Sequence, residues 1–442
     1  MKRPLTLFLS TLIITLTGCS SDNSSSEINE QGISQITLEN ENSDLTFLSP
    51  IITSGQTNTY DEDGNIIETN IDDPLYGQDG DYNSLEFSFT LNSDGTTTDN
   101  NTGLMWETVP MGGKSSWEDA INYCNELELG GYDDWRIPTV EELFSISDFS
   151  VGWPYLDTGY FSFDESNDSS MMPPQMDEDG GPQGGGPQGG LPQGEESQGL
   201  INENNSENSE LSEMPPMEIP NSSDYISLGG VSKDDGQYWT SSHNMVEGDE
   251  RLGDIAFGVN HSTGHIKAYP SDSTPMMGKY VRAVRGNVYG DENYTNNNDG
   301  TVTDNESGLM WLQDDLGYGM DWAEALSSAE NFEFAGYDDW RLPDVKELQS
   351  IVDYGGSYPA INQDYFNCSI LEENENYYYW TSTSAYFSEI SPNYDSAWYV
   401  AFGYTSHGAG AVRFSPKYVG SEALSEGEDN ILNSVRLVRN VN

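Results

Sequence analysis

Two short stretches of the chain place carboxylates beside an arginine, an arrangement that can serve general acid and base chemistry. The segment GYDDWR occurs twice, with Asp133, Asp134 and Arg136 in one copy and Asp338, Asp339 and Arg341 in the other. A duplicated scaffold gives these groups another use, because residues kept in both copies are suited to internal ion pairs and hydrogen bonds. We therefore predict structural roles and no catalytic residue. The repeat-matched residues in this prediction are Arg136 with Arg341, Arg282 with Arg436, Arg285 with Arg439, Trp106 with Trp311, Trp135 with Trp340, and Trp239 with Trp380.

A second set of carboxylates lies in the loops DGTTTDN and DGTVTDN. Their aspartates are Asp94 and Asp99 in the first loop, and Asp299 and Asp304 in the second. Carboxylate and amide oxygens at short spacing can hold Ca²⁺, so calcium is a candidate cofactor. The spacing does not complete a calcium loop of the EF-hand type. Turns stabilised by Asx hydrogen bonds explain the same residues and are the favoured interpretation.

Aromatic side chains gather near the C-terminal part of the chain and offer a third candidate site. They are Tyr377, Tyr378, Tyr386, Phe387 and Tyr394. Flat rings of this kind can stack against a sugar or bind an apolar patch of a protein. Burial in a strand core is the competing interpretation. Serine or cysteine nucleophile chemistry finds no matching motif.

The elements that position these residues are written twice. TGLMW at residues 102–106 returns as SGLMW at 307–311, and Trp117 is 18 residues before Trp135, as Trp322 is before Trp340. YWTSS and VRAVR in the first copy match YYWTST and VRLVR in the second. Agreement in order, type and spacing indicates a tandem domain duplication.

Each copy predicts two helices followed by a mainly antiparallel sheet. Ser115 with Glu118, and Asp321 with Glu324, are typical of capping boxes at the start of the first helix. Pro-Thr and Pro-Asp steps after DWR begin the second helix. Short strands rich in aromatic residues and valine follow, so the fold class is α+β, present twice.

These motifs resemble a known family, the domain named for the C-terminal part of the Legionella collagen-like adhesin. The resemblance rests on TGLMW, GYDDWR, YWTSS and VRxVR, and on the upstream stretch ITSGQTNTYDEDG at residues 52–64. It implies two tandem domains with a C-type-lectin-like fold, similar also to formylglycine-generating enzymes. It further implies binding of carbohydrate or protein, and the cysteines of the enzyme relatives have no counterpart here.

Charge restricts the classes of partner. The chain has 75 acidic and 16 basic residues, a net charge of −59, which repels nucleic acid and anionic glycans. A neutral glycan or an envelope protein remains as an expected partner. The stretch 164–224 has no Phe, Trp or Tyr and cannot form a core, so we expect a disordered insertion.

The N-terminus predicts export and lipid anchoring. Lys2 and Arg3 precede an apolar run that ends at Leu16-Thr17-Gly18-Cys19, which is typical of a signal peptide too short to span a bilayer. It resembles a lipoprotein signal of a Gram-negative bacterium, which implies a lipid on Cys19 and a place at the outer membrane or cell surface.

Together these observations predict a signal at 1–19, a disordered tether at 20–45, a first domain at 46–288 and a second at 289–442. We expect a non-catalytic surface lipoprotein that acts in adhesion or ligand binding. The alternative is a structural spacer or a subunit of an envelope complex without a small ligand.

Overall fold

The computed structural model describes most of the two repeats and the segment before them. The described residues are 50–82, 84–150, 152, 154–163, 236–245, 254–272, 278–370, 377–386, 394–403, 405, 407–421 and 431–441, with the backbone of two short strands, β1 (Ile36–Thr37) and β2 (Thr46–Phe47). The predicted signal with Cys19, most of the predicted tether, the insertion at 164–224 and Phe387 lie outside the described residues.

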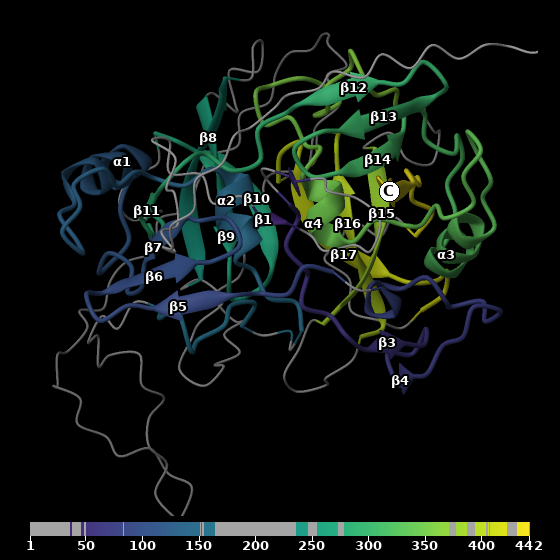
Figure 1. Ribbon diagram of the computed structural model, residues 1–442, viewed down its shortest axis with the longest axis horizontal. Coiled ribbons are helices and arrows are strands. Elements are labelled where there is room, and N and C mark those ends of the chain that lie inside the picture. Colours follow the sequence, from purple (N-terminus) through teal and green to yellow (C-terminus); the bar gives the residue numbers. More distant parts are fainter. Residues whose placement is uncertain are drawn as a thin grey trace, which may run out of the picture. The chain divides into compact units, whose positions relative to one another are not determined.

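The two repeats contain the same elements in the same order (Figure 1). The first consists of β5 (Phe89–Leu91), β6 (Thr96–Asp99), β7 (Met105–Glu107), α1 (Trp117–Glu126), α2 (Val140–Ser145), β8 (Gln237–Met245), β9 (Asp254–Asn260), β10 (His265–Pro270) and β11 (Val284–Arg285). The second consists of β12 (Tyr294–Asn296), β13 (Thr301–Asp304), β14 (Leu309–Leu312), α3 (Trp322–Glu330), α4 (Val345–Gln349), β15 (Tyr378–Ala385), β16 (Ser396–Ala401), β17 (Ala411–Pro416) and β18 (Val438–Asn440). The α+β prediction with two helices in each repeat is confirmed.

Side chains at the helix starts explain where the helices begin. Thr139 and Asp344 form capping boxes with Glu142 and Glu347, as the sequence predicts. The prediction for α1 was wrong by one residue, because Ser116 is the N-cap and accepts from the Asp119 N–H. The backbone N–H and C=O of Ser115 instead pair with those of Lys279 in a β-bridge, so the helix begins one residue later than predicted.

Each repeat closes a small antiparallel sheet around its GLMW strand. The first has the strand order β11-β7-β6-β5 and the second β12-β13-β14-β18. The final Val-Arg strand of each repeat therefore pairs with the GLMW strand, although some 130 to 180 residues separate them in sequence. This pairing joins the beginning of each repeat to its end.

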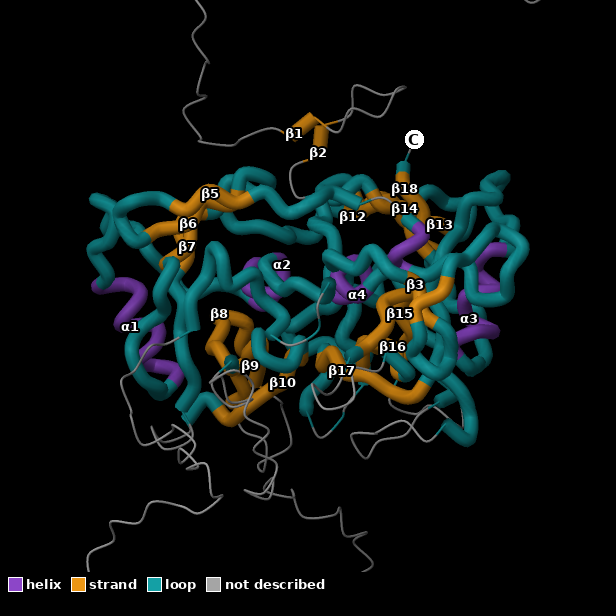
Figure 2. Tube along the Cα trace, turned by 90° about the horizontal axis from the view of Figure 1, so that it is seen from below, coloured by secondary structure: helices purple, strands orange, loops and turns teal. Residues whose placement is uncertain are grey.

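The larger sheet joins the two repeats to each other. Its order is β15-β16-β17-β10-β9-β8, and Ile266 of β10 lies opposite Val412 of β17. The three strands of one repeat thus continue into the three strands of the other. Strands β8 and β15, which match in the repeats, form the two edges of the sheet (Figure 1). Figure 2 shows α2 and α4 next to each other on this sheet, and both contact it.

Aromatic contacts between the repeats are reciprocal. Phe149, just after α2, packs edge-on against Trp398 of β16 with ring centroids 5.4 Å apart. The matching Tyr354, just after α4, packs edge-on against Phe257 of β9 at 4.7 Å. All four side chains are buried in one hydrophobic cluster. A two-fold relation between the repeats follows from these matched contacts.

The segment before the repeats, residues 50–82, which we call the lead-in, occurs once. It contains β3 (Thr59–Tyr60), β4 (Ile66–Ile67) and the single 3₁₀ turn η1 (Asp79–Asp81). The sequence grouped the lead-in with the first repeat, yet its hydrogen bonds reach far along the chain into the second, from Gln56 to Ser384, from Thr383 to Asp79 and from Tyr82 to Glu330.

None of the described helices has the length and apolar composition needed to cross a membrane.

Candidate functional site

The arginines of the two GYDDWR segments lie in ion pairs with the same geometry. Arg136 binds both carboxylate oxygens of Glu142 at 2.6 Å, and Arg341 binds those of Glu347 at 2.5 and 2.6 Å. Because these glutamates also cap α2 and α4, each ion pair holds the DWR segment to the start of a helix. The partners of the neighbouring aspartates are equally matched: Asp134 pairs with Arg285, and Asp339 with Arg439, both at 2.6 Å.

The remaining matched arginines, Arg282 and Arg436, are fully buried and donate to backbone carbonyls. Arg282 donates to Glu107, Thr108 and Ser162, and Arg436 donates to Leu312, Gln313 and Asn367, at 2.6–2.8 Å. A guanidinium that satisfies three carbonyls holds the loops that supply them in place. The matched tryptophans are all buried: Trp106, Trp135, Trp239, Trp311, Trp340 and Trp380.

The aspartates considered for calcium accept hydrogen bonds within their own loops. Asp94 and Asp299 each accept from the hydroxyl and the N–H of the threonine two residues on, with hydroxyl distances of 2.7 Å. Asp99 accepts from the Thr102 hydroxyl, and Asp304 from the Ser307 hydroxyl. Within the described residues, no group of three or more His, Cys, Asp or Glu side chains is placed to hold a metal ion.

The tyrosines considered for ligand binding lie largely inside the protein. Tyr377, Tyr378 and Tyr386 are 8%, 2% and 9% exposed, and Tyr378 packs on Tyr399 with ring centroids 4.7 Å apart. Tyr394 stacks at 4.0 Å on Tyr60 of the lead-in. Tyr378 and Tyr394 therefore pack against other rings of the protein, and Tyr377 and Tyr386 leave little ring surface for a sugar.

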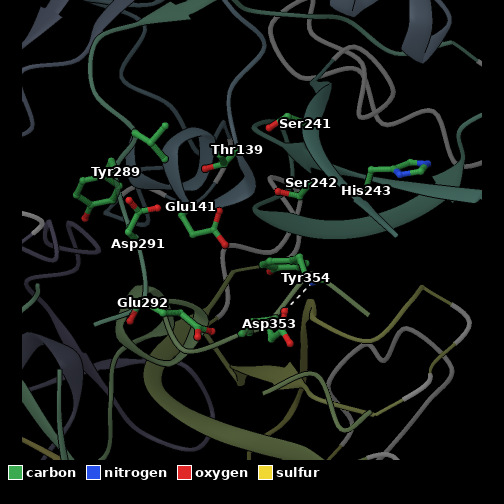
Figure 3. A pocket seen from close by; sticks show the side chains of 15 residues that line it. Thr139, Glu141, Ser241, Ser242, His243, Tyr289, Asp291, Glu292, Asp353 and Tyr354 are labelled. Carbon is green, nitrogen blue, oxygen red and sulfur yellow. Dashed lines mark hydrogen bonds between the residues drawn. The ribbon is translucent and has the colours of Figure 1, made fainter. Parts of the chain in front are cut away.

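An open pocket of about 450 Å³ lies between the two repeats (Figure 3). The first repeat contributes Thr139 and Glu141 from the start of α2, and Ser242 and His243 from the edge strand β8. The linker that leads to the second repeat passes one side of the pocket, and residues 350–355 after α4 close the other. Its volume is in the range of small-ligand sites in proteins.

The pocket is polar and acidic. Glu141, Asp291, Glu292 and Asp353 line it, and its lining includes no lysine or arginine. Figure 3 shows Glu141 near Asp291, with Ser242 and Tyr354 close to the same space. Burial raises the pKa of Glu141 to about 7, and the charges of Glu142 and Glu292 add to the rise. A carboxyl destabilised in its charged form gains from a cationic or hydrogen-bond-donating ligand.

The pocket residues were missed in the sequence because no motif joins them. Glu141 and Asp353 are more than 200 residues apart, and the pocket forms only when the two repeats meet. One signal was present: the repeat occurs twice, whereas the ITSGQ lead-in occurs once. A duplicated scaffold with a single lead-in implies one surface that the chain covers and one that it does not.

Comparison with known proteins agrees with the repeat structure. The model of the Lcl C-terminal domain family matches residues 95–178 and again residues 300–420. No curated protein and no solved structure matches the chain. The matched family is the one whose motifs the sequence resembles, and no catalytic family is identified. Residues 95–178 and 300–420 of this chain are therefore two segments of the Lcl C-terminal domain family.

Proposed function

We propose that this protein is a non-catalytic ligand-binding protein of the bacterial envelope, active in adhesion or ligand capture, and that the pocket between its repeats is the binding site. The observation that carries the proposal is the pocket itself, an open space of about 450 Å³ lined by hydroxyls and four carboxylates. A site of this size and polarity suits a small polar molecule or a short stretch of a larger one.

Two features support binding rather than catalysis. The arginines of the GYDDWR segments, and the second aspartate of each, Asp134 and Asp339, could have moved protons but lie in ion pairs within the scaffold. The pocket carboxylates come from three separate segments around an open space, which suits recognition of a complementary charge. The chain's net charge of −59 favours neutral or cationic partners over anionic ones.

The proposal includes a lipid anchor on Cys19 at the outer membrane or cell surface, as the N-terminal sequence predicts. A tether of about 25 residues would let the two repeats reach ligands some distance from the membrane. Release of the protein into the aqueous phase by a Cys19→Ala substitution, followed by membrane fractionation, tests this part independently of ligand binding.

The binding proposal is tested with a glycan and peptide array probed with the intact protein, with Ca²⁺ and again with chelator. Two variants locate any binding. Val288→Trp places a large side chain at the pocket, where Val288 is 51% exposed, and Val419→Trp makes the same change at a 66% exposed position outside it. We expect binding that Val288→Trp abolishes and Val419→Trp leaves unchanged.

Other results would redirect the account. Binding lost with chelator but unaffected by Val288→Trp would move the site to the aspartate loops. An array without signal in every condition would contradict ligand capture and favour the alternative role as a spacer or envelope subunit.

A further inference from the structure

The pocket has a counterpart in the other half of the molecule, and that counterpart is filled by the chain itself. The two-fold relation matches Ser242 and His243 of β8 with Thr383 and Ser384 of β15, and Tyr354 with Phe149. At this second place the lead-in residues Thr53–Gln56, which we call the TSGQ segment, contact the matching positions. We call this place the filled site.

The TSGQ segment is held through backbone groups and one side-chain amide. Gln56 binds both the N–H and the C=O of Ser384, at 2.8 and 3.0 Å, and so pairs with the edge of β15 as a strand would. The Ser54 carbonyl accepts from the Phe149 N–H at 2.7 Å. The Thr53 carbonyl accepts from the Lys346 ammonium at 2.9 Å.

The same groups line the open pocket. His243 lies opposite Ala256 in the ladder, as Ser384 lies opposite Ala397, so its N–H and C=O face the edge that Gln56 covers in the filled site. The Tyr354 N–H matches that of Phe149, and in the described part of the chain no hydrogen bond from it is found. Ser242 caps the Val140 N–H as Thr383 caps that of Val345, but only Thr383 has a carboxylate, Asp79, on its hydroxyl.

One position reverses the charge between the two sites. Lys346 in α4, which is 3% exposed, reaches the Thr53 and Ser145 carbonyls in the filled site. Its repeat counterpart is Glu141, which lines the open pocket with Asp291, Glu292 and Asp353. The group that contacts Lys346 is a carbonyl, which accepts a hydrogen bond. A group that contacts Glu141 must instead donate a hydrogen bond or carry positive charge.

From this correspondence we propose that the open pocket binds an extended peptide segment that resembles TSGQ in backbone and amide but carries lysine or arginine at the position facing Glu141. The inference rests on the proposed function and names its ligand class. A side-chain amide would pair with the backbone of His243, a carbonyl would accept from the Tyr354 N–H, and a cation would meet Glu141. The partner is therefore a basic, extended stretch of another protein.

A lead-in from a second copy of the chain is excluded as the occupant by its charge. The residues that follow TSGQ include Asp61, Glu62 and Asp63 and no lysine or arginine up to Tyr82. Brought beside four pocket carboxylates, this segment would add like charges at close range. The chain's own lead-in instead meets Lys346 in the filled site, and its Asp61 carbonyl meets Lys417 further along.

Three capped peptides added to the intact protein test the proposal by calorimetric titration. They are Ac-Lys-Ser-Gly-Gln-Lys-NH₂, a version with both lysines replaced by glutamate, and a version with glutamine replaced by glutamate. We expect the first to bind at least tenfold more tightly than either of the others. Raising the salt concentration should weaken its binding, because the ion pair with Glu141 is screened.

Variants of the protein test whether the lysine side chain of the peptide lies beside Glu141. Glu141→Lys recreates the chemistry of the filled site, so it should weaken the lysine peptide at least tenfold and strengthen Ac-Ile-Thr-Ser-Gly-Gln-Thr-NH₂. Glu126→Lys, an equal change of charge at an exposed position on α1, is the matched control and should leave both unchanged. Glu141→Gln serves as a second variant if thermal melting shows that Glu141→Lys unfolds.

The outcomes separate this inference from the proposed function. Equal binding of lysine and glutamate peptides, or binding indifferent to Glu141→Lys and Glu141→Gln, overturns the inference. A glycan that binds and is blocked by Val288→Trp, with no peptide binding, also overturns the inference while supporting ligand capture at the pocket. No binding of any probe contradicts both.

Discussion

The filled site and the open pocket are built at matching positions of a repeated scaffold, and they differ in charge, with Lys346 in one and Glu141 in the other, and in whether the chain covers them. In the filled site, Gln56 completes the edge of β15 at Ser384, and Lys346 holds the backbone of the TSGQ segment. In the open pocket, the matching edge at His243 borders a space of about 450 Å³. The scaffold thus presents two matching strand edges, and the single lead-in covers one of them.

The two sites should also differ in what they contribute to the stability of the fold. A filled edge contributes to stability, whereas an open edge is available for a partner. The scaffold interactions, such as those of Arg282 and Arg436, are the same in both repeats and should contribute equally. Substitutions at matched scaffold positions should therefore change the free energy of unfolding equally in the two repeats, whereas substitutions at the filled site and the open pocket should not.

The largest loss of stability is expected at the buried arginines that both repeats contain. Arg282→Met and Arg436→Met each remove a buried guanidinium that donates to three backbone carbonyls, at a cost of about 4 kcal/mol in the free energy of unfolding. Chemical denaturation followed by tryptophan fluorescence measures both. Losses that differ by more than about 2 kcal/mol would show that the two arginines are not equivalent supports.

A somewhat smaller loss of stability is expected at the strand edge that only the second repeat has covered. Gln56→Ala leaves the buried N–H and C=O of Ser384 unsatisfied, so we expect a loss of about 3 kcal/mol. Gln363→Ala, at an exposed position, is the matched control and should change stability by less than about 0.5 kcal/mol. A Gln56 variant as stable as its control would mean that the lead-in does not hold the edge of β15.

The charge reversal predicts opposite dependences on pH. Burial lowers the pKa of Lys346 to about 7, so between about pH 7 and its unfolded value of 10.5 the unfolded chain binds more protons. Stability then rises with pH in that window, by up to about 1.4 kcal/mol per pH unit. Lys346→Met should remove this rise, which denaturation at several pH values measures against the wild type.

Glu141 should make the stability of the protein depend on pH in the opposite sense to Lys346. Its pKa is raised from 4.5 to about 7 in the folded protein, which therefore binds more protons than the unfolded chain between those values. Stability falls as pH rises through that window, with the same limiting slope of about 1.4 kcal/mol per pH unit. Glu141→Gln should make the dependence on pH shallower there. Profiles of the two variants that both follow the wild type would contradict the charge reversal.

Local features of the fold could be predicted from the sequence because they depend on nearby residues. The capping boxes at Thr139 and Asp344, and the turns around Asp94 and Asp299, involve partners within three residues. The matched motifs predicted the duplication, and the helix starts followed by short strands in each copy predicted the α+β class. Duplication also distinguished supporting arginines from catalytic ones, since both copies kept them.

Long-range features could not be predicted in this way. Pairing of β10 with β17 joins Ile266 to Val412, 146 residues further along the chain, and the sequence of neither strand indicates this partner. The tyrosines at 377, 378 and 386 have the composition of a binding surface, but they are buried against other aromatic rings, those of Tyr358, Tyr399 and Tyr394. The open pocket depends on long-range pairing and on packing. It forms where the two repeats meet, at the surface that matches the filled site but has no TSGQ segment on it.

The central claim is tested most directly by hydrogen–deuterium exchange resolved at two backbone amides, His243 and Ser384. The Ser384 N–H is bound to Gln56 and should exchange slowly with or without ligand. The His243 N–H should exchange faster in the free protein and slow markedly when Ac-Lys-Ser-Gly-Gln-Lys-NH₂ is added. If His243 exchanges as slowly as Ser384 in the free protein, or does not respond to the peptide, the edge of β8 is not an open counterpart of the filled site.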